Sequence, residues 1–450
     1  MKNHALRFIF ILSAIMLMAA CTVSNSDMPV IREPEESNHT DSSGPEPQEP
    51  DSLKEPQWPA LPTVEVWTDN MEPLSCDYVT APDGSMGQSI TNSKKVCGRM
   101  TITQNGKTLY DSQEYQEDIS GMTIKIRGNT SAWSRKKPYK IKLQQAADLL
   151  ERGDDNTYAD KEWLLIREGR GQLNTMIGLK ISELLGLQWT PGFRYVNLTL
   201  NGAPQGLYLL IESVKRKACR LNVSKSGYII EFDPYWWNED VWFETLMTVS
   251  NDAKFTFKYP DSKDILTAQI DPIKDYINAF DEGLAVTNIF SEYIDTVSFA
   301  SWLLAQDILG NNDGYGSNIY LTKYDHTKDS KLKMGCLWDF DAIMMTPGRW
   351  SDSHWLPYFA RLISNSTDRA VANAYHELWT EVKDSLLIVM KNYLESFASS
   401  EEGEWLDQAI AADNKLWGHS SPPLRQLINE AEAWFDDRKQ WLETAIADIK

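Results

Sequence analysis

The sequence predicts an α+β fold of two lobes, with a β-rich N-terminal half and a largely helical C-terminal half. Short segments in which apolar and polar residues alternate recur up to about residue 262, and turn residues separate them, as is typical of strands. From about Asp264 onward most apolar residues recur at helical spacing. Because clefts between lobes commonly hold ligands, we expect a binding site where the two halves meet.

Strands in the N-terminal half are predicted from alternation and from turn residues. Residues 122–126 alternate apolar and polar side chains, and Asn-Gly at 201–202 between two apolar segments is a strong hairpin signal. Residues 137–143 form a further predicted strand, with Lys140 and Lys142 on the same face. These segments indicate an antiparallel, hairpin-connected sheet.

The helical part of the chain contains one expected β-like interruption. Residues 173–187 have helical spacing and stop at Gly186, and residues 370–450 read as helices with acidic faces. Between them, residues 317–324 and 331–338 are predicted to form a pair of strands.

The N-terminus is typical of a lipoprotein signal peptide. Residues 1–20 begin with Lys2 and Arg7, continue with an apolar run too short to span a bilayer, and end in small residues before Cys21. A cysteine in this position resembles a lipobox, with Met18 where Leu is usual. We therefore expect export, cleavage before Cys21 and a lipid on that cysteine that anchors the chain to a membrane bilayer of the cell envelope. The alternative is an ordinary signal peptide with a coincidental cysteine.

Residues 21–60 are predicted to be a lipidated, disordered tether, because Pro, Glu, Ser and Asp dominate and leave too little apolar surface to fold. The rest of the chain is long enough to bury a core. Its 44 Lys and Arg against 64 Asp and Glu give a formal net charge of -20. That balance argues against nucleic acid and against an anionic membrane surface as partners.

Four cysteines remain after Cys21, namely Cys76, Cys97, Cys219 and Cys336. An even number in an oxidising compartment permits two disulfides. Cys76 with Cys97 is the first candidate pair, because both lie in the same β-rich region. None of the four has the spacing of a zinc site.

A cluster of carboxylates and amides is the strongest candidate site. Asp313 and Asn318 lie in a glycine-rich segment, and Asp339 and Asp341 follow in the segment CLWDFD. Protein kinases separate their catalytic Asp and metal-binding Asn by the same five positions. Mg²⁺ prefers oxygen ligands, and a remaining carboxylate can accept a proton from a hydroxyl. Asp and Asn are also common turn residues, so the spacing alone favours a pair of turns.

Several segments, in order, resemble the CotH family, the spore coat protein H group of atypical secreted kinases. They are IRGNTS at 126–131, KKPYKIKL at 136–143, LNGAPQGLYLLIE at 200–212, GYIIE at 227–231, NDGYGSNIYL at 312–321 and WDFD at 338–341. The resemblance implies a two-lobed atypical protein-kinase-like domain over residues 119–450. Its N-lobe would cover about 119–262 and its C-lobe about 263–450, after a small β-rich region at 61–118.

The resemblance also implies an activity and its residues. The activity would be metal-dependent transfer of phosphate from ATP, with Mg²⁺ or Mn²⁺, to a Ser or Thr hydroxyl of a protein in the envelope or outside the cell. By position, Asp313 is similar to the catalytic Asp and Asn318 to the metal-binding Asn. Asp339 resembles the Mg²⁺-binding Asp that follows, with Asp341 as a second candidate.

Nucleotide-binding residues are implied in the same way. Lys142 is the first candidate for the phosphate-binding lysine and Lys140 the next, and Arg127 is a further phosphate ligand. Glu212 is expected to hold a lysine or to lie near the nucleotide. The two lysines fit a solvated strand face equally well, since charged residues normally lie outside.

The sequence departs from kinase patterns at several points. It has no G-x-G-x-x-G loop, and Asn311 and Asn312 precede Asp313 where typical protein kinases have His-Arg. The family usually has an Asp and an Arg-Asn pair near Leu173, whereas residues 169–175 here read GRGQLNT. An inactive scaffold or binding protein is therefore an alternative.

A carbohydrate-binding surface protein is the other alternative. The chain has 17 tryptophans, and aromatic rings stack on sugars, while paired carboxylates can hydrolyse glycosides. Trp236, Trp237, Trp242, Trp350 and Trp355 lie in polar surroundings. Packing inside the protein is the more common role of tryptophan.

Overall fold

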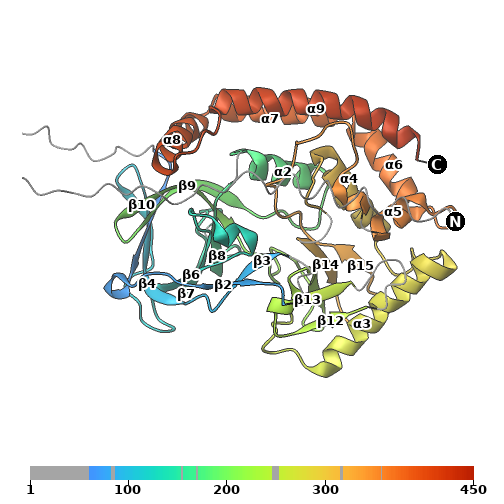
Figure 1. The fold of residues 1–450 in the computed structure, drawn as a ribbon, viewed down its shortest axis with the longest axis horizontal. Coiled ribbons are helices and arrows are strands. Elements are labelled where there is room, and N and C mark those ends of the chain that lie inside the picture. The colour runs from blue at the N-terminus through green and yellow to red at the C-terminus, as the bar shows by residue number, and fades with distance from the viewer. Residues whose placement is uncertain are drawn as a thin grey trace, which may run out of the picture. The chain divides into compact units, whose positions relative to one another are not determined.

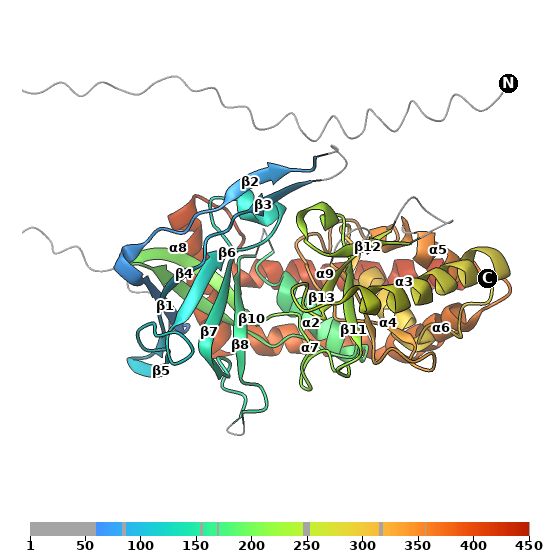
Figure 2. The ribbon, with the colours of Figure 1, turned by 90° about the horizontal axis from the view of Figure 1, so that it is seen from below.

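The strands of the N-terminal half form one eight-stranded sheet, in the order β1-β9-β10-β8-β7-β6-β4-β5 (Figure 2). β1 also pairs with β4, which closes the sheet into a ring with β5 attached outside it. The contacts are antiparallel except for β1 with β9. The strands are β1 Thr63–Thr68, β4 Val96–Gln104, β5 Lys107–Asp111, β6 Met122–Ile126, β7 Tyr139–Ala147, β8 Asp160–Ile166, β9 Phe193–Leu200 and β10 Ala203–Glu212.

This computed structural model describes residues 60–82, 87–153, 156–168, 171–245, 253–314, 318–355 and 357–449. They belong to one unit, residues 57–450. The predicted signal peptide, Cys21 and the tether up to residue 59 lie outside the described residues. In the part that is described, no helix is both long and apolar enough to cross a bilayer.

Alternating burial explains the ring. Val64, Ile124, Ile141 and Leu165 come from four different strands, are all buried, and point into one apolar cluster inside it. Their neighbours along each strand face outward, as the period of a strand requires. The strands β1, β4 and β5, from residues 61–118, are therefore part of the same sheet as the strands that follow them.

A second, five-stranded sheet has the order β12-β13-β11-β14-β15. β11 pairs directly with β14, with Tyr228 opposite Lys323. This sheet crosses the lobe boundary predicted near residue 262, and it contains the strand pair predicted within the helical half. Its strands are β11 Tyr228–Phe232, β12 Trp242–Glu244, β13 Lys254–Tyr259, β14 Ile319–Lys323 and β15 Leu332–Met334.

The remaining chain is mainly helical, so the predicted β-rich first half and helical second half are confirmed. The C-terminal helices α7, α8 and α9 pack on one another, and α9 also packs on α4 (Figure 1). The helices are α2 Asn174–Leu184, α3 Thr267–Glu282, α4 Thr296–Leu309, α5 Pro357–Ser364, α6 Ala370–Val382, α7 Ser385–Ala398, α8 Glu401–Trp417 and α9 Leu424–Ala447. Short helical turns are η1 Asp69–Met71, η2 Thr130–Trp133, η3 Trp236–Asn238, η4 Gly283–Thr287 and η5 Asp352–Trp355.

The four described cysteines are free thiols, and Cys76 is not bonded to Cys97. The expected pair is therefore not present. Cys97 lies within β4, whereas Cys76 precedes the hairpin of β2 (Asp77–Thr80) and β3 (Gln88–Thr91). Location in one β-rich region was too weak a criterion, because a disulfide also needs closely placed and correctly oriented side chains.

The end of α4 is fixed by a buried cation from α9. Arg438 is only 1% exposed. Its guanidinium donates to the Asp307 carbonyl (2.5 Å) and to the carbonyls of Pro347 (2.6 Å) and Arg349 (2.5 Å). The indole N–H of Trp434 donates to the Ile308 carbonyl at 3.1 Å. The bonds to Asp307 and Ile308 reach carbonyls of the last turn of α4, where carbonyls lack helix partners, and the Asp307 carbonyl also accepts the Gly310 N–H at 3.1 Å.

The side chain of Asp307 is held just as closely. It accepts bonds from Ser351 Oγ (2.7 Å) and Tyr375 Oη (2.8 Å), and it lies 2.9 Å from His354 Nε2. Burial by itself would raise the pKa of Asp307, but the neighbouring His354, Arg438 and Ser351 outweigh burial and lower it. The ionised form is therefore stabilised in the folded protein.

We expect Arg438→Met to lower the free energy of unfolding by about 3 kcal/mol, because it leaves buried carbonyls and Asp307 without their cation. The matched control is Lys439→Met on the next residue, whose ion pair with the exposed Asp384 should contribute less than about 1 kcal/mol. Urea denaturation measures both variants. Equal effects of the two substitutions would show that Arg438 does not anchor α4.

Candidate active site

One cavity collects most of the predicted site residues. It has a volume of about 720 Å³ and is lined by residues from β6, β11, β14 and the loops around them. Six predicted residues share this lining, namely Arg127, Lys140, Asp313, Asn318, Asp339 and Asp341. Residues far apart in the chain meet there because β14 lies next to β11 and both sheets border the cavity.

A buried asparagine shapes the turn that carries Asp313. α4 ends at Gly310, whose φ of +56° is left-handed; a Cβ there would lie 2.5 Å from the Trp434 ring. The Oδ1 atom of Asn311 accepts the backbone N–H of Asp313 at 2.9 Å, and its Nδ2 donates to Gln306 Oε1 at 2.9 Å. The carboxylate of Asp313 is thereby presented to the cavity, whose walls shield it from part of the solvent although the residue as a whole reaches the surface.

The loop that carries Asp339 is tied to that turn. The backbone N–H of Asn312 donates to the Ala342 carbonyl at 3.0 Å, and Asn318 Nδ2 donates to Asp339 Oδ2 at 3.3 Å. Asn318 and Asp339 have φ values of +62° and +65°. Left-handed residues other than glycine store strain and cluster at functional sites. This pair of left-handed residues brings an amide and a carboxylate side by side.

The surroundings of Asp313 and Asp339 raise the proton affinity of both carboxylates. Burial, followed by the charges of Asp339 and Asp341, raises the pKa of Asp313 to about 6. Burial also raises the pKa of Asp339, although Arg127 and Arg167 oppose the shift. A concentration of negative charge that is only partly compensated by arginine favours the binding of a cation.

The residues present fit a divalent metal that is shared with a ligand. Within the described ranges, no three His, Cys, Asp or Glu side chains are arranged to hold a metal ion by themselves. Mg²⁺ commonly uses one or two carboxylates and takes its other ligands from phosphate and water. Asp339, Asn318 and Asp341 offer hard oxygen donors of this kind.

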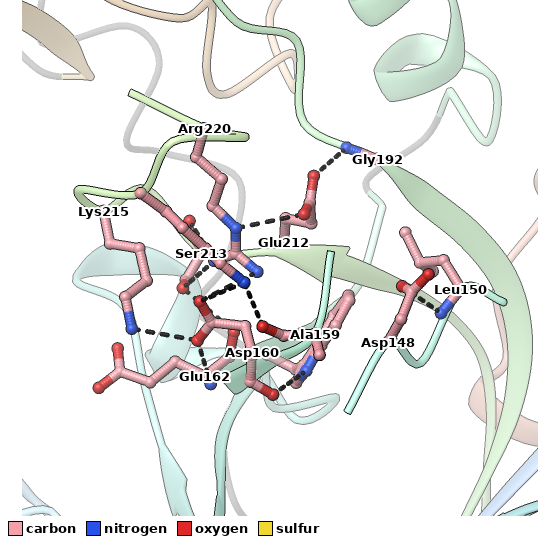
Figure 3. Close-up of polar contacts among 12 residues, drawn as sticks. Asp148, Leu150, Ala159, Asp160, Glu162, Gly192, Glu212, Ser213, Lys215 and Arg220 are labelled. Atoms are coloured by element: carbon pink, nitrogen blue, oxygen red, sulfur yellow. Dashed lines mark hydrogen bonds and ion pairs between the residues drawn. The ribbon is translucent and has the colours of Figure 1, made fainter. Parts of the chain in front are cut away.

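Two predicted residues lie away from the cavity lining. Lys142 is exposed on β7 and does not line the cavity, whereas Lys140 lines it together with Lys125 and Lys258 and pairs with Glu162 at 2.9 Å. Glu212 is buried at the end of β10. Figure 3 shows its carboxylate accepting the N–H of Gly192 (2.8 Å) and a bond from Arg220 (3.2 Å). It also binds Arg152 at 2.9 Å, so Glu212 holds arginines rather than a lysine.

Sequence reasoning missed two groups of residues. Arg167, directly after β8, lines this cavity and belongs to no motif that would have marked it. The second group lies in the segment that departs from the family. Asn174 Nδ2 donates to the Phe340 carbonyl at 2.9 Å, and Glu168 accepts the backbone N–H of Thr175 at 2.8 Å. The described part of this segment thus supports the loop of Asp339.

A family model decides the relationship of the chain. The model described as CotH kinase protein matches residues 124–442, more than half of the sequence. The chain belongs to the CotH kinase family. Arg127, Asp313, Asn318 and Asp339 all lie within the matched residues of this CotH protein.

Other comparisons add little to the family assignment. The CotH chain is similar to the Helicobacter pylori proinflammatory kinase CtkA, at 10% sequence identity over 68% of this chain and 95% of that one, with a TM-score of 0.30. We draw nothing about fold or function from a TM-score this low. None of the curated proteins matches the chain.

The tryptophans give no support to sugar stacking in this CotH cavity. Among the described side chains, Trp338 is the one tryptophan in its lining. Trp350 packs edge-on against Trp441, and Trp236 packs against Trp242 with ring centroids 4.3 Å apart. These contacts are the ordinary packing role of aromatic rings.

We expect Asp339→Asn to lower the pKa of Asp313 in metal-free protein, because the negative charge of Asp339 is one cause of the raised value. NMR titration of aspartate carboxyl carbons should place Asp313 near pH 6 in the wild type and about one unit lower in the variant. Asp384→Asn, at an exposed surface position, should leave the titration unchanged. An unchanged midpoint in Asp339→Asn would show that the two carboxylates do not interact.

Proposed function

We propose that the chain is a metal-dependent protein kinase that transfers the terminal phosphoryl group of ATP to a Ser or Thr hydroxyl. One observation carries the proposal: Asp313, Asn318 and Asp339 meet in one cavity with Arg127, inside the segment matched by the CotH family model. The kinase-like two-lobed arrangement belongs to the same proposal. The eight-stranded sheet would supply one wall of the nucleotide site and the helical half the catalytic loop.

Each residue has a role that its surroundings support. The acceptor hydroxyl oxygen forms a bond to the terminal phosphorus while the bond from that phosphorus to the leaving nucleotide oxygen breaks. The hydroxyl proton passes to the carboxylate of Asp313, which is ionised above pH 6. Arg127 and Arg167 offer planar guanidinium groups that suit phosphate oxygens.

Asn318, Asp339 and Asp341 would hold the metal. When bound, Mg²⁺ or Mn²⁺ would neutralise phosphate charge and orient the terminal phosphoryl group. The residues themselves keep the cavity polar and bring the metal ligands next to Asp313. Because the metal needs phosphate oxygens to complete its ligands, metal and nucleotide should bind together.

Replacing the proposed base tests catalysis directly. We expect Asp313→Asn to lower kcat for phosphate transfer by about 10²- to 10⁴-fold, with nucleotide affinity nearly unchanged. The control is Asp329→Asn, an exposed aspartate of a nearby loop that does not line the cavity. Transfer of labelled phosphate from ATP to generic acceptors and to the chain itself measures both. Wild-type rates in Asp313→Asn would contradict the assignment.

Replacing a metal ligand tests binding instead. We expect Asp339→Asn to weaken the joint binding of Mg²⁺ and ATP by at least about tenfold, because a hard anionic ligand is lost. Isothermal titration with and without Mg²⁺ separates the two ligands. Wild-type binding without any transfer would favour the second candidate, an inactive scaffold, for which the altered segment at 169–175 is the motive.

We further propose that the protein is exported and anchored through lipid on Cys21, which would place its protein acceptor in the cell envelope or outside the cell. The support is the signal-peptide pattern and the small residues before Cys21. Cells fed a labelled fatty acid should label the wild type but not Cys21→Ser. Equal labelling of both would disprove the anchor.

A further inference from the structure

A hairpin outside the family-matched segment forms part of the active-site cavity. β2 and β3 form a two-stranded sheet that ends before residue 124, where the family match begins. Residues 89–93, from β3 and just after it, nevertheless line the cavity. Figure 2 shows the hairpin reaching from the eight-stranded sheet toward the second sheet.

A single buried hydroxyl connects the hairpin to both sides of the cavity. Ser89 is fully buried. Its Oγ donates to Asn129 Oδ1 at 2.7 Å in the loop after β6, and it accepts a bond from Asn238 Nδ2 at 3.0 Å in η3. Asn238 Nδ2 also donates to the Ile90 carbonyl at 2.9 Å. Asn129 and Asn238 both line the cavity, so Ser89 joins β3 to two other segments of the cavity lining.

Further contacts hold the hairpin in this place. The indole N–H of Trp133 donates to the Ser89 carbonyl at 3.1 Å, and the Trp133 ring packs edge-on against Tyr78 of β2. On the other side, Gly87 lies so close to the Tyr235 ring that a Cβ would meet it at 2.5 Å. These contacts hold the hairpin in a defined position, where it forms one wall of the cavity.

The chemistry of this wall differs from that of the rest of the cavity. The cavity-lining residues of β3 are Ser89, Ile90 and Thr91; neither they nor the following Asn92 carry a charged side chain. The charged residues that suit phosphate and metal, Arg127 and the carboxylates around Asp339, come from other elements. Neutral hydroxyl, amide and backbone groups match the hydrogen-bonding edges of a base and the hydroxyls of a ribose.

We propose that the β2–β3 hairpin is the nucleoside-binding wall of the cavity and sets the affinity for the donor nucleotide. This inference rests on the proposed kinase function and deepens it. Ser89 is a positioning residue in it, because its hydroxyl fixes the wall through Asn129 and Asn238. The phosphates and the metal are held elsewhere, so loosening the wall should weaken binding of the nucleoside and spare binding of phosphate.

The test compares ATP with inorganic tripolyphosphate, which has the phosphates but no nucleoside. We expect Ser89→Ala to raise KM for ATP about 5- to 10-fold while kcat stays within about twofold, as expected from the loss of two hydrogen bonds at a binding wall. Inhibition by tripolyphosphate with Mg²⁺ should keep its wild-type constant. Gln88→Ala, on the exposed face of the same strand, is the matched control and should behave as the wild type.

Asn238→Ala removes the hydrogen bond between Asn238 and Ser89 from the other side, and it replaces Ser89→Ala in the test if that variant does not fold. An unchanged KM for ATP in the folded variant, or equal weakening of ATP and tripolyphosphate, would overturn the inference while leaving the kinase function standing. Failure of the wild type to bind ATP in calorimetry would overturn both. Weaker binding of ATP with unchanged binding of tripolyphosphate in either variant would establish the hairpin as the nucleoside-binding wall.

Discussion

The buried guanidinium of Arg438 links the C-terminal helix to the catalytic turn. It donates to the carbonyl of Asp307, whose side chain is itself held by Ser351, Tyr375 and His354. Because α4 ends at Leu309 and the turn to Asp313 follows directly, these bonds fix the position from which that turn starts. A buried cation without partners would be unstable, so the helices and the turn depend on one another.

A series of hydrogen bonds connects the end of α4 to the loops of the site. Asn311 shapes the turn, the Asn312 N–H joins it to Ala342, and Asn174 holds the Phe340 carbonyl. Asp313 and Asp339 thus come from two loops that are hydrogen-bonded to one another. Burial raises the pKa of both carboxylates, and repulsion by the charge of Asp339 raises the pKa of Asp313 further. A metal bound with phosphate would relieve the repulsion.

Much of this was predictable where one local pattern determines the outcome. The alternation of apolar and polar residues predicted the strands. The spacing of Asp313, Asn318 and Asp339 marked residues that line the same cavity. Long-range pairing was less predictable. The pairing of β11 with β14 crosses the expected lobe boundary, and the arginine partners of Glu212, Arg152 and Arg220, come from loops outside its strand. Arg167, Asn174 and Ser89 act through tertiary contacts that no sequence spacing reveals.

The central claim is that this cavity binds a metal–nucleotide complex at the turn of Asp313. A crystal structure with Mn²⁺ and a non-hydrolysable ATP analogue, read from the anomalous signal of Mn²⁺, tests it most directly. We predict the Mn²⁺ peak at coordination distance from Asp339 and Asn318, with the terminal phosphate facing Asp313. Mn²⁺ and nucleotide bound elsewhere, such as in the neighbouring cavity lined by Trp417 and His419, would contradict the claim.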